Sequence, residues 1–547
     1  MTSTPLANFP LDCWIQTLEY LPTRDLDNLS RVSRDTRAST EAFLYRSIHW
    51  DWKNPPIHKI MLLLRTISER PELAYYVWHV SLVWWDVEQS SKETGVFIPK
   101  GNIDWTKITL QCRPALRWAR KVVRDAKFPE KLHAKLLARL FHGDAYFYAT
   151  LLVSQLHNLR SLRLDFSFVL EGGFPGEMLH HSLFGNAPPG VLTRFSRLEM
   201  VDYGSNSPLT ELNYRNNSNL HGSYQFMPWF HLPSLKILEI WLHNVEGICV
   251  FSRQMPKTSL NLSNLRSLVI AKSSVLAADI ARLLSQVPYL ESLHLGMGYQ
   301  CREIAEFFKE PERLLRSLET SSQTMKHLSL GLELLPCCTE TFRLRVTNGT
   351  GGNPFHGILN KFPKLQTASL PLNFLTGWET TAYELQDVLP PTLEALHIRS
   401  DLWRNSGLIE FELETLKALK LFLRHKENGT HPLLRTFSYP KQHEYDEDEI
   451  HALGLEASFD FLVQREAIHL FSFRRGYKVF SRYDDCAPGF MLKSATCVDN
   501  VVYWLPWPFV RVDELPASMP RESISTFSNP RDSTDANLPD LESIDSN

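Results

Sequence analysis

The chain repeats one short apolar pattern, leucine–x–x–leucine–x–leucine, with other apolar residues allowed at each leucine position. Its middle residues recur every 25 to 41 positions between Leu162 and Phe437. Apolar and variable residues alternate within each L-x-L, as in a β-strand with one buried face. Such recurrence predicts strands stacked along one continuous body. The ten registers are Val77/Val80/Leu82, Leu159/Leu162/Leu164, Leu198/Val201/Tyr203, Leu235/Leu238/Ile240, Leu265/Leu268/Ile270, Leu290/Leu293/Leu295, Met325/Leu328/Leu330, Leu365/Ala368/Leu370, Leu393/Leu396/Ile398 and Leu434/Phe437/Tyr439.

The segments between these registers predict helices. Residues 277–284, 303–318 and 408–423 each have an amphipathic pattern with helical spacing. A leucine-rich repeat is usually about 20–29 residues long, so the longer intervals indicate insertions. We therefore predict an α/β fold, an irregular leucine-rich-repeat solenoid with a parallel concave sheet and convex helices. The alternative is an ordinary α/β domain with scattered leucine pairs.

The first fifty residues predict three short helices. Pro10 and Asp12 favour a helix start, because the first turn does not need the proline N–H and its dipole favours an anion. Thr23 is expected to cap the second helix, and the third is expected over about residues 35–45. The apolar residues exceed what three short helices can bury among themselves. This unit is either a docking module or a helical cap on the following domain.

These residues resemble an F-box, and the resemblance covers about residues 6 to 50. A closing segment, Leu44 to Ile48, is similar to the end of many fungal F-boxes. One departure is Thr36, where many F-boxes have tryptophan. The resemblance rests on the order and spacing of Phe9-Pro10-Leu11-Asp12, Ile15, Leu18, Leu21-Pro22, Asp25-Leu26, Leu29 and Val32-Ser33-Arg34.

Membership of this family implies binding to the Skp-type adaptor of a cullin-RING ubiquitin ligase. The whole chain then resembles fungal F-box proteins with degenerate leucine-rich repeats. The implied partners are the adaptor, the ligase reached through it, and an unknown target protein. The adaptor-binding residues implied by the resemblance are Pro10, Leu11, Ile15, Leu18 and Leu21, with Leu26, Leu29 and Val32 in support.

The predicted domain organisation has five parts. Residues 1–50 form the F-box, 51–82 a helical bridge with the first repeat strand, and 83–480 the solenoid with its insertions. Residues 481–514 contain an aromatic stretch with two prolines, which predicts a strap packed on the last repeat or, alternatively, an interaction peptide. Residues 515–547 are rich in serine, proline, aspartate and asparagine, so we expect a disordered tail.

The composition argues against several classes of protein. A formal net charge of −3 provides no global attraction for nucleic acid. No apolar run reaches about 18 residues, and the N-terminus lacks the pattern of a secretory signal, so we expect no membrane partner. Eight cysteines in 547 residues fit free thiols in a reducing compartment. We expect a cytoplasmic or nuclear protein.

No motif predicts catalysis, a metal site or a cofactor. The glycine-rich stretch 349–353 lacks the strand-to-helix context of a phosphate loop. Cys337 and Cys338 do not have zinc-ligand spacing, and His180 and His181 lie in a long insertion with no directly adjacent acidic or cysteine residue, so we assign no metal to them. We therefore expect a non-catalytic protein.

The variable residues of the L-x-L strands are expected to face the concave surface, where a target protein would bind. Aromatic and arginine side chains are enriched at binding hot spots. The expected function is substrate recognition in an SCF-type ubiquitin ligase; the alternatives are a scaffold acting outside ubiquitination and a plain repeat protein with a helical cap. The expected target-binding residues are Trp85, Arg163, Trp241, His294, His397 and Arg399; the competing interpretation is that they are ordinary exposed strand residues.

Overall fold

The computed structural model describes two units, one ending at Leu44 and one beginning at Tyr45. The structure describes residues 10–84, 112–206, 223–242, 260, 262–273, 275, 277–299, 311–334, 357–376, 384–399, 417–418, 421–422, 433–441 and 469–474.

The first unit contains helices α1 (Leu11–Tyr20), α2 (Thr23–Ser30) and α3 (Arg34–Leu44). All three were predicted. Thr23 is the first residue of α2 and provides no cap, because Pro22 holds the capping position without a side-chain hydrogen bond. Ser33 and Thr36 form a reciprocal cap at the start of α3: the backbone N of Ser33 donates to Thr36 Oγ1 over 3.0 Å, and the backbone N of Thr36 donates to Ser33 Oγ over 3.1 Å.

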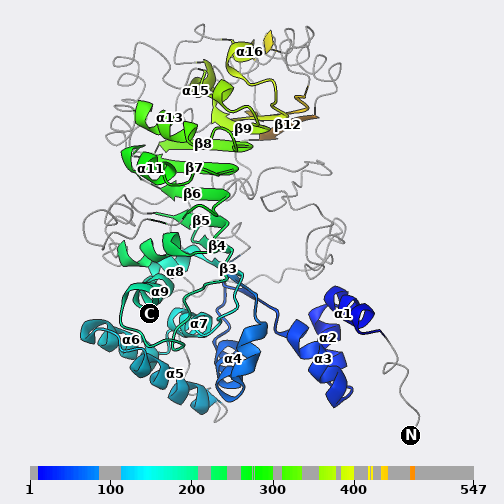
Figure 1. Ribbon diagram of the computed structural model, residues 1–547, viewed down its shortest axis with the longest axis vertical. Coiled ribbons are helices and arrows are strands. Elements are labelled where there is room, and N and C mark those ends of the chain that lie inside the picture. Colours follow the sequence, from blue (N-terminus) through cyan, green and yellow to red (C-terminus); the bar gives the residue numbers. More distant parts are fainter. Residues whose placement is uncertain are drawn as a thin grey trace, which may run out of the picture. The chain divides into compact units, whose positions relative to one another are not determined.

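The second unit is built on one parallel sheet, in which the twelve described strands follow each other in sequence order (Figure 1). All ten predicted registers lie on β2 to β11. This mixed α/β architecture is consistent with a leucine-rich-repeat-like solenoid. The strands are β1 (Ser47–Asp51), β2 (His79–Val83), β3 (Ser161–Leu164), β4 (Met200–Tyr203), β5 (Ile237–Trp241), β6 (Ser267–Ser273), β7 (Ser292–Tyr299), β8 (His327–Leu334), β9 (Thr367–Pro371), β10 (Ala395–Arg399), β11 (Thr436–Lys441) and β12 (His469–Arg474).

Strand β1 changes the predicted boundary between the first two parts. It pairs in parallel with β2, with Ile48 opposite Val80. The sheet thus begins inside the range 1–50 predicted for the F-box. Ile48 is buried, and pairing along a complete neighbouring strand draws residues 47–51 into the second unit. The predicted parts 481–514 and 515–547 lie outside the described residues.

The helices of the second unit include α11, which matches the predicted helix over 277–284. Helix α13 covers the second half of the predicted 303–318, and most of 408–423 lies outside the described residues. The helices are α4 (Ile57–Glu69), α5 (Arg113–Asp125), α6 (Glu130–His142), α7 (Ala145–Val153), α8 (Phe166–Leu170), α9 (Phe174–Phe184), α11 (Ala277–Leu284), α13 (Pro311–Glu319), α15 (Leu372–Thr376) and α16 (Leu385–Val388), with short 3₁₀ turns η2 (Pro71–Tyr76), η7 (Ser223–Gln225), η8 (Met227–His231) and η11 (Leu359–Lys361).

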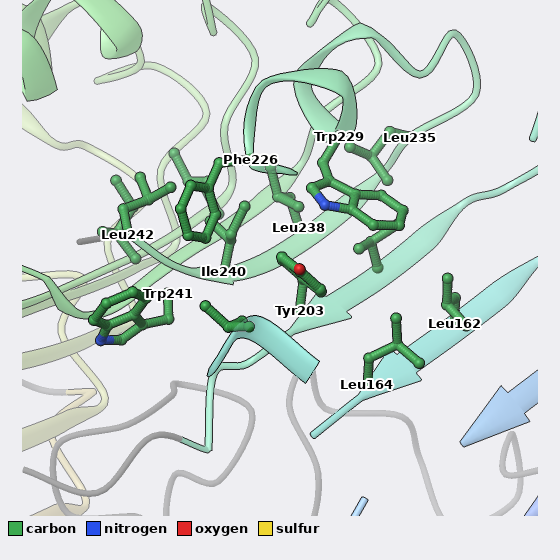
Figure 2. Packing of buried hydrophobic residues seen from close by; sticks show 14 of the residues in the cluster. Leu162, Leu164, Tyr203, Phe226, Trp229, Leu235, Leu238, Ile240, Trp241 and Leu242 are labelled. Carbon is green, nitrogen blue, oxygen red and sulfur yellow. The ribbon is translucent and has the colours of Figure 1, made fainter. Parts of the chain in front are cut away.

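The core of the second unit lies on the leucine side of the sheet. The middle residues of neighbouring strands, such as Leu162, Val201 and Leu238, stand opposite each other in register and are buried. Figure 2 shows Tyr203 and Trp229 packed beside this row; their ring centroids are 5.2 Å apart. Burying a large apolar side chain stabilises the fold by roughly 1.5–3 kcal/mol, so a continuous leucine row stabilises the stack without a central globular core.

Candidate protein-binding surfaces

The first unit exposes part of the apolar set that the resemblance implied for adaptor binding. The Ile15 side chain on α1 is 38% exposed, and Val32, just after α2, is 68% exposed. Tyr20, which the sequence analysis did not select, is also exposed. Exposed apolar side chains on so small a unit are a candidate protein-binding surface.

The remaining implied residues divide by burial. Leu18 is only 1% exposed and Leu26 is also buried, so these two side chains pack inside the protein. Pro10 is exposed, and Leu21 and Leu29 are half-buried. Leu11 is the first residue of α1, and its side chain lies outside the described residues. The structure thus separates residues that can be reached by a partner from residues that shape the helices.

In the second unit, a polar row crosses the sheet on the face opposite the leucine row. The register aligns its members strand by strand. From β1 to β10 they are His49, Ser81, Arg163, Asp202, Glu239, Val269, His294, Ser329, Ser369 and His397.

Arg163 and Asp202 form an ion pair within this polar row. Nε and Nη2 of Arg163 both donate to Asp202 Oδ2 over 3.2 Å. Asp202 Oδ1 accepts from the backbone N of Ser205, also over 3.2 Å. Both carboxylate oxygens of Asp202 are therefore engaged.

Glu239, the next member of the polar row, differs from Asp202 in its hydrogen bonding. Its side chain is buried, and Oε2 has no hydrogen-bond partner. Burial and the neighbouring Asp202 raise the pKa of Glu239, and Arg163 lowers it; the pKa lies at about 8. Two carboxyl groups thus share one guanidinium on this part of the sheet.

Two histidines of this sheet face, His327 and His397, have strongly lowered pKa values. Burial, with help from Lys326, lowers the pKa of His327 to about 3, and burial with Arg399 lowers the pKa of His397 to about 4. His294 Nδ1 lies 2.8 Å from Ser329 Oγ, and His327 Nδ1 lies 2.8 Å from Thr367 Oγ1. These imidazoles act as hydrogen-bonding groups between strands.

Three of the six predicted target-binding side chains are buried, contrary to the expectation that they face an open concave surface. Trp241 is 6% exposed, and its ring packs edge-on against Phe166 with centroids 5.0 Å apart. His294 and Arg399 are also buried. Strand alternation predicts the face of the sheet that a residue occupies, but it does not predict whether that face is covered.

The other three residues have different outcomes. Arg163 is half-buried and paired with Asp202, and His397 is half-buried. Trp85 lies outside the described residues. Whether any of the six binds a target stays a prediction.

A second surface, which the sequence analysis missed, lies where the strands begin. The residue just before each strand from β2 to β11 continues the backbone ladder, as when Arg160 N donates to Trp78 O over 2.7 Å. The guanidinium groups of Arg46 and Arg160 lie 4.4 and 4.2 Å from the Trp78 ring centroid. Farther along the same edge Lys236 pairs with Glu199 over 2.8 Å. The sequence does carry a pattern that indicates this surface, because one charged residue stands just before most of the repeat strands.

The residues considered for metal binding do not form a ligand set in the part of the chain that the structure describes. There, no group of three or more histidine, cysteine, aspartate or glutamate side chains is placed to hold a metal ion. His181 Nε2 lies 2.8 Å from the Ala126 carbonyl oxygen, and the His180 ring packs against Tyr224 at 4.9 Å. Residues 337–338 and 349–353 lie outside the described residues. None of the helices within the described ranges is both long and apolar enough to span a membrane.

Comparison with known proteins identifies the first unit. Residues 6–41 match the family model of the F-box domain, a range that takes in α1, α2 and most of α3. No curated protein matches the chain. The F-box match supports the identification of the chain as an F-box protein. It also supports a role in binding the Skp-type adaptor of an SCF-type ubiquitin ligase. F-box proteins are generally non-catalytic substrate receptors.

Proposed function

We propose that this protein is a substrate-recognition subunit of an SCF-type ubiquitin ligase. The F-box would bind the Skp-type adaptor, and the repeat sheet would bind a target protein. The observation that carries this proposal is the F-box match at residues 6–41, together with the exposed Ile15 and Val32 on the same unit. The parallel sheet supports the second half, because repeat sheets offer long binding surfaces.

In this function the protein raises the rate of ubiquitin transfer without reacting itself. Holding a target beside the transfer machinery replaces a bimolecular encounter by an intramolecular one. The protein would work in the cytoplasm or nucleus. The free thiols of Cys13 and Cys112 are compatible with such a reducing compartment. A leucine-rich-repeat assignment for the solenoid and a fungal origin remain predictions.

The first test is the affinity of the full chain for a purified Skp-type adaptor. The test variant is Ile15→Ala/Val32→Ala, because both side chains are exposed and their loss leaves the interior of the helices intact. The matched control is Tyr76→Ala, which removes an exposed aromatic ring from the second unit. Leu18→Ala is unsuitable, because truncating a buried leucine lowers the free energy of unfolding by about 2–5 kcal/mol.

We expect the double variant to bind the adaptor at least about tenfold more weakly, which corresponds to about 1.4 kcal/mol, and the control to bind like the wild type. Equal thermal unfolding of the three proteins shows that folding is unchanged. If the wild-type chain does not bind any Skp-type adaptor, the N-terminal helices are a cap and the ligase function must be abandoned.

A further inference from the structure

Glu239 has a buried acceptor without a donor. The side chain is 1% exposed, and Oε2 has no hydrogen-bond partner. A buried polar atom in this state costs roughly 1–3 kcal/mol relative to a paired one. Buried polar groups in folded proteins are almost always satisfied, so an exception needs a physical explanation.

The neighbouring residues of the polar row do not provide a donor for the Glu239 carboxyl group. In register it lies between Asp202 on β4 and Val269 on β6. Among the described members of the polar row, Arg163 on β3 carries the guanidinium nearest to Glu239 in register, and its Nε and Nη2 both donate to Asp202. On the other side, β6 presents Ser267 and Val269, which carry no charge, and β7 presents His294, which contacts Ser329. Within the described part of the polar row, Asp202 and Glu239 thus place two carboxyl groups beside one guanidinium.

A second unsatisfied group lies on the same sheet face. Ser267 Oγ is buried and has no hydrogen-bond partner. Ser267 pairs with Ile237, which is two residues before Glu239 on β5. Residues two apart on a strand share a face, so Ser267 and Glu239 are diagonal neighbours on adjacent strands, with Cα atoms on the order of 8 Å apart. One small polar group could contact both.

Solvent reaches the sheet close to this pair. Met200 on β4 and Ile237 on β5 precede the polar row by two residues, and both are half-buried. Arg163 on β3 is also half-buried. A slender side chain could therefore approach Glu239 over these three residues, with its apolar stem along Met200 and Ile237.

We propose that Glu239 and Ser267 bind the cationic end of a lysine or arginine side chain of the target protein. An ammonium or guanidinium group supplies the missing donors to Glu239 Oε2 and Ser267 Oγ, and its positive charge favours the ionised form of Glu239. The aliphatic stem of such a side chain matches the apolar rim formed by Met200 and Ile237. This inference rests on the target-binding half of the proposed function and is independent of adaptor binding.

The test uses the immobilised full chain and a library of heptapeptides with random flanks and a fixed central residue. The four central residues are arginine, lysine, citrulline and norleucine. Citrulline has nearly the shape of arginine without its charge, and norleucine has the stem of lysine without its ammonium group. The protein variants are Glu239→Gln and Ser267→Ala. The control is Glu394→Gln, which removes an exposed carboxylate just before β10 of the same sheet.

We expect at least fivefold enrichment of arginine- or lysine-centred peptides over their neutral counterparts with the wild type and with Glu394→Gln. Glu239→Gln should abolish this enrichment and Ser267→Ala should reduce it, with both variants folded by circular dichroism. Equal recovery of charged and neutral peptides by the wild type would overturn the proposal and indicate that an ordered water satisfies Glu239. Unchanged enrichment by Glu239→Gln would overturn it as well.

The same variants separate this inference from the ligase function. Glu239→Gln should bind the Skp-type adaptor as tightly as the wild type, since Glu239 is in the second unit. Loss of peptide enrichment with intact adaptor binding supports the basic side-chain site. An absence of enrichment in a wild type that does bind the adaptor overturns this site alone.

Discussion

At the scale of single residues, burial determines the chemistry of the sheet face that carries the polar row. Glu239, His327 and His397 are all held toward their neutral forms, because burial disfavours the charged form of each group. Asp202 has different contacts, since Arg163 donates two hydrogen bonds to it. Neighbouring carboxyl groups on adjacent strands thus have opposite surroundings.

The first prediction concerns the pH dependence of stability. The folded-state pKa of Glu239 is raised from 4.5 to about 8, so its contribution to stability is complete below pH 4.5 and is lost as the pH rises through 8. Glu239→Gln should therefore gain stability over the wild type as the pH rises, by roughly 1–3 kcal/mol at pH 8. Urea unfolding at pH 5 and pH 8 measures this difference. A difference that is the same at both pH values would contradict it.

The second prediction separates packing from binding at Trp241. Because the ring is buried against Phe166 and Phe226, Trp241→Ala should cost about 3–5 kcal/mol of unfolding free energy. Chemical denaturation followed by circular dichroism measures this cost. Lys236→Ala, on the same repeat but in a surface ion pair, is the control and should change stability by less than about 1 kcal/mol. A Trp241 variant as stable as the wild type would argue that the ring is available for target binding after all.

At the scale of elements, side-chain caps fix where a helix begins, and close backbone contacts fix how it packs. Asp144 precedes α7, and its Oδ1 accepts from the backbone N of Tyr146 over 2.9 Å and of Phe147 over 3.2 Å. Its Oδ2 accepts from Arg139 over 3.0 Å. The side chain of Asp144 therefore joins the end of α6 to the start of α7.

The third prediction tests this cap. Asp144→Ala removes the acceptor for two backbone N–H groups and should destabilise the protein by about 1–2 kcal/mol. Asp144→Asn keeps an oxygen acceptor and should retain much of the cap. Thermal unfolding at pH 7 compares the two variants. Equal losses for alanine and asparagine would show that the charge interaction with Arg139 outweighs capping.

The fourth prediction concerns the contact between α9 and η7. A Cβ at Gly176 would overlap the backbone carbonyl of Gln225, and backbone cannot move aside as a side chain can. Gly176→Ala should therefore destabilise the protein by about 1–3 kcal/mol, although alanine favours helices. Gly190→Ala is the matched control for added side-chain volume, because nothing lies within 4 Å of the Cβ it would add. Because Gly190 has a positive φ, a small backbone cost of about 1 kcal/mol is expected there.

At the scale of the whole molecule, the chain divides at residues 44 and 45 into a helical unit and a sheet unit. Strand β1 belongs to the sheet unit even though it directly follows the F-box helices in sequence. It supplies the first strand of the described sheet. Trp52, just after β1, is fully buried and packs against Tyr146 and Phe168.

The fifth prediction compares two truncations. A chain that starts at residue 45 keeps β1 and should unfold cooperatively, near the temperature of the full chain, while losing adaptor binding. A chain that starts at residue 53 lacks β1 and Trp52 and should lose several kcal/mol or fail to fold, because it exposes the edge of β2 and leaves a cavity beside Tyr146. Calorimetry distinguishes the two. Equal stability would place β1 outside the cooperative unit.

The sequence by itself determined the repeat strands and the three N-terminal helices. Those features depend on apolar spacing along short segments, which alternation and helical periodicity report directly. Only the tertiary structure decided that residues 47–51 join the sheet, that Trp241, His294 and Arg399 are buried, and that Glu239 lacks a donor. These outcomes depend on which segments, tens of residues apart in the chain, come into contact. Burial and hydrogen bonding are properties of that assembly, so no local pattern contains them.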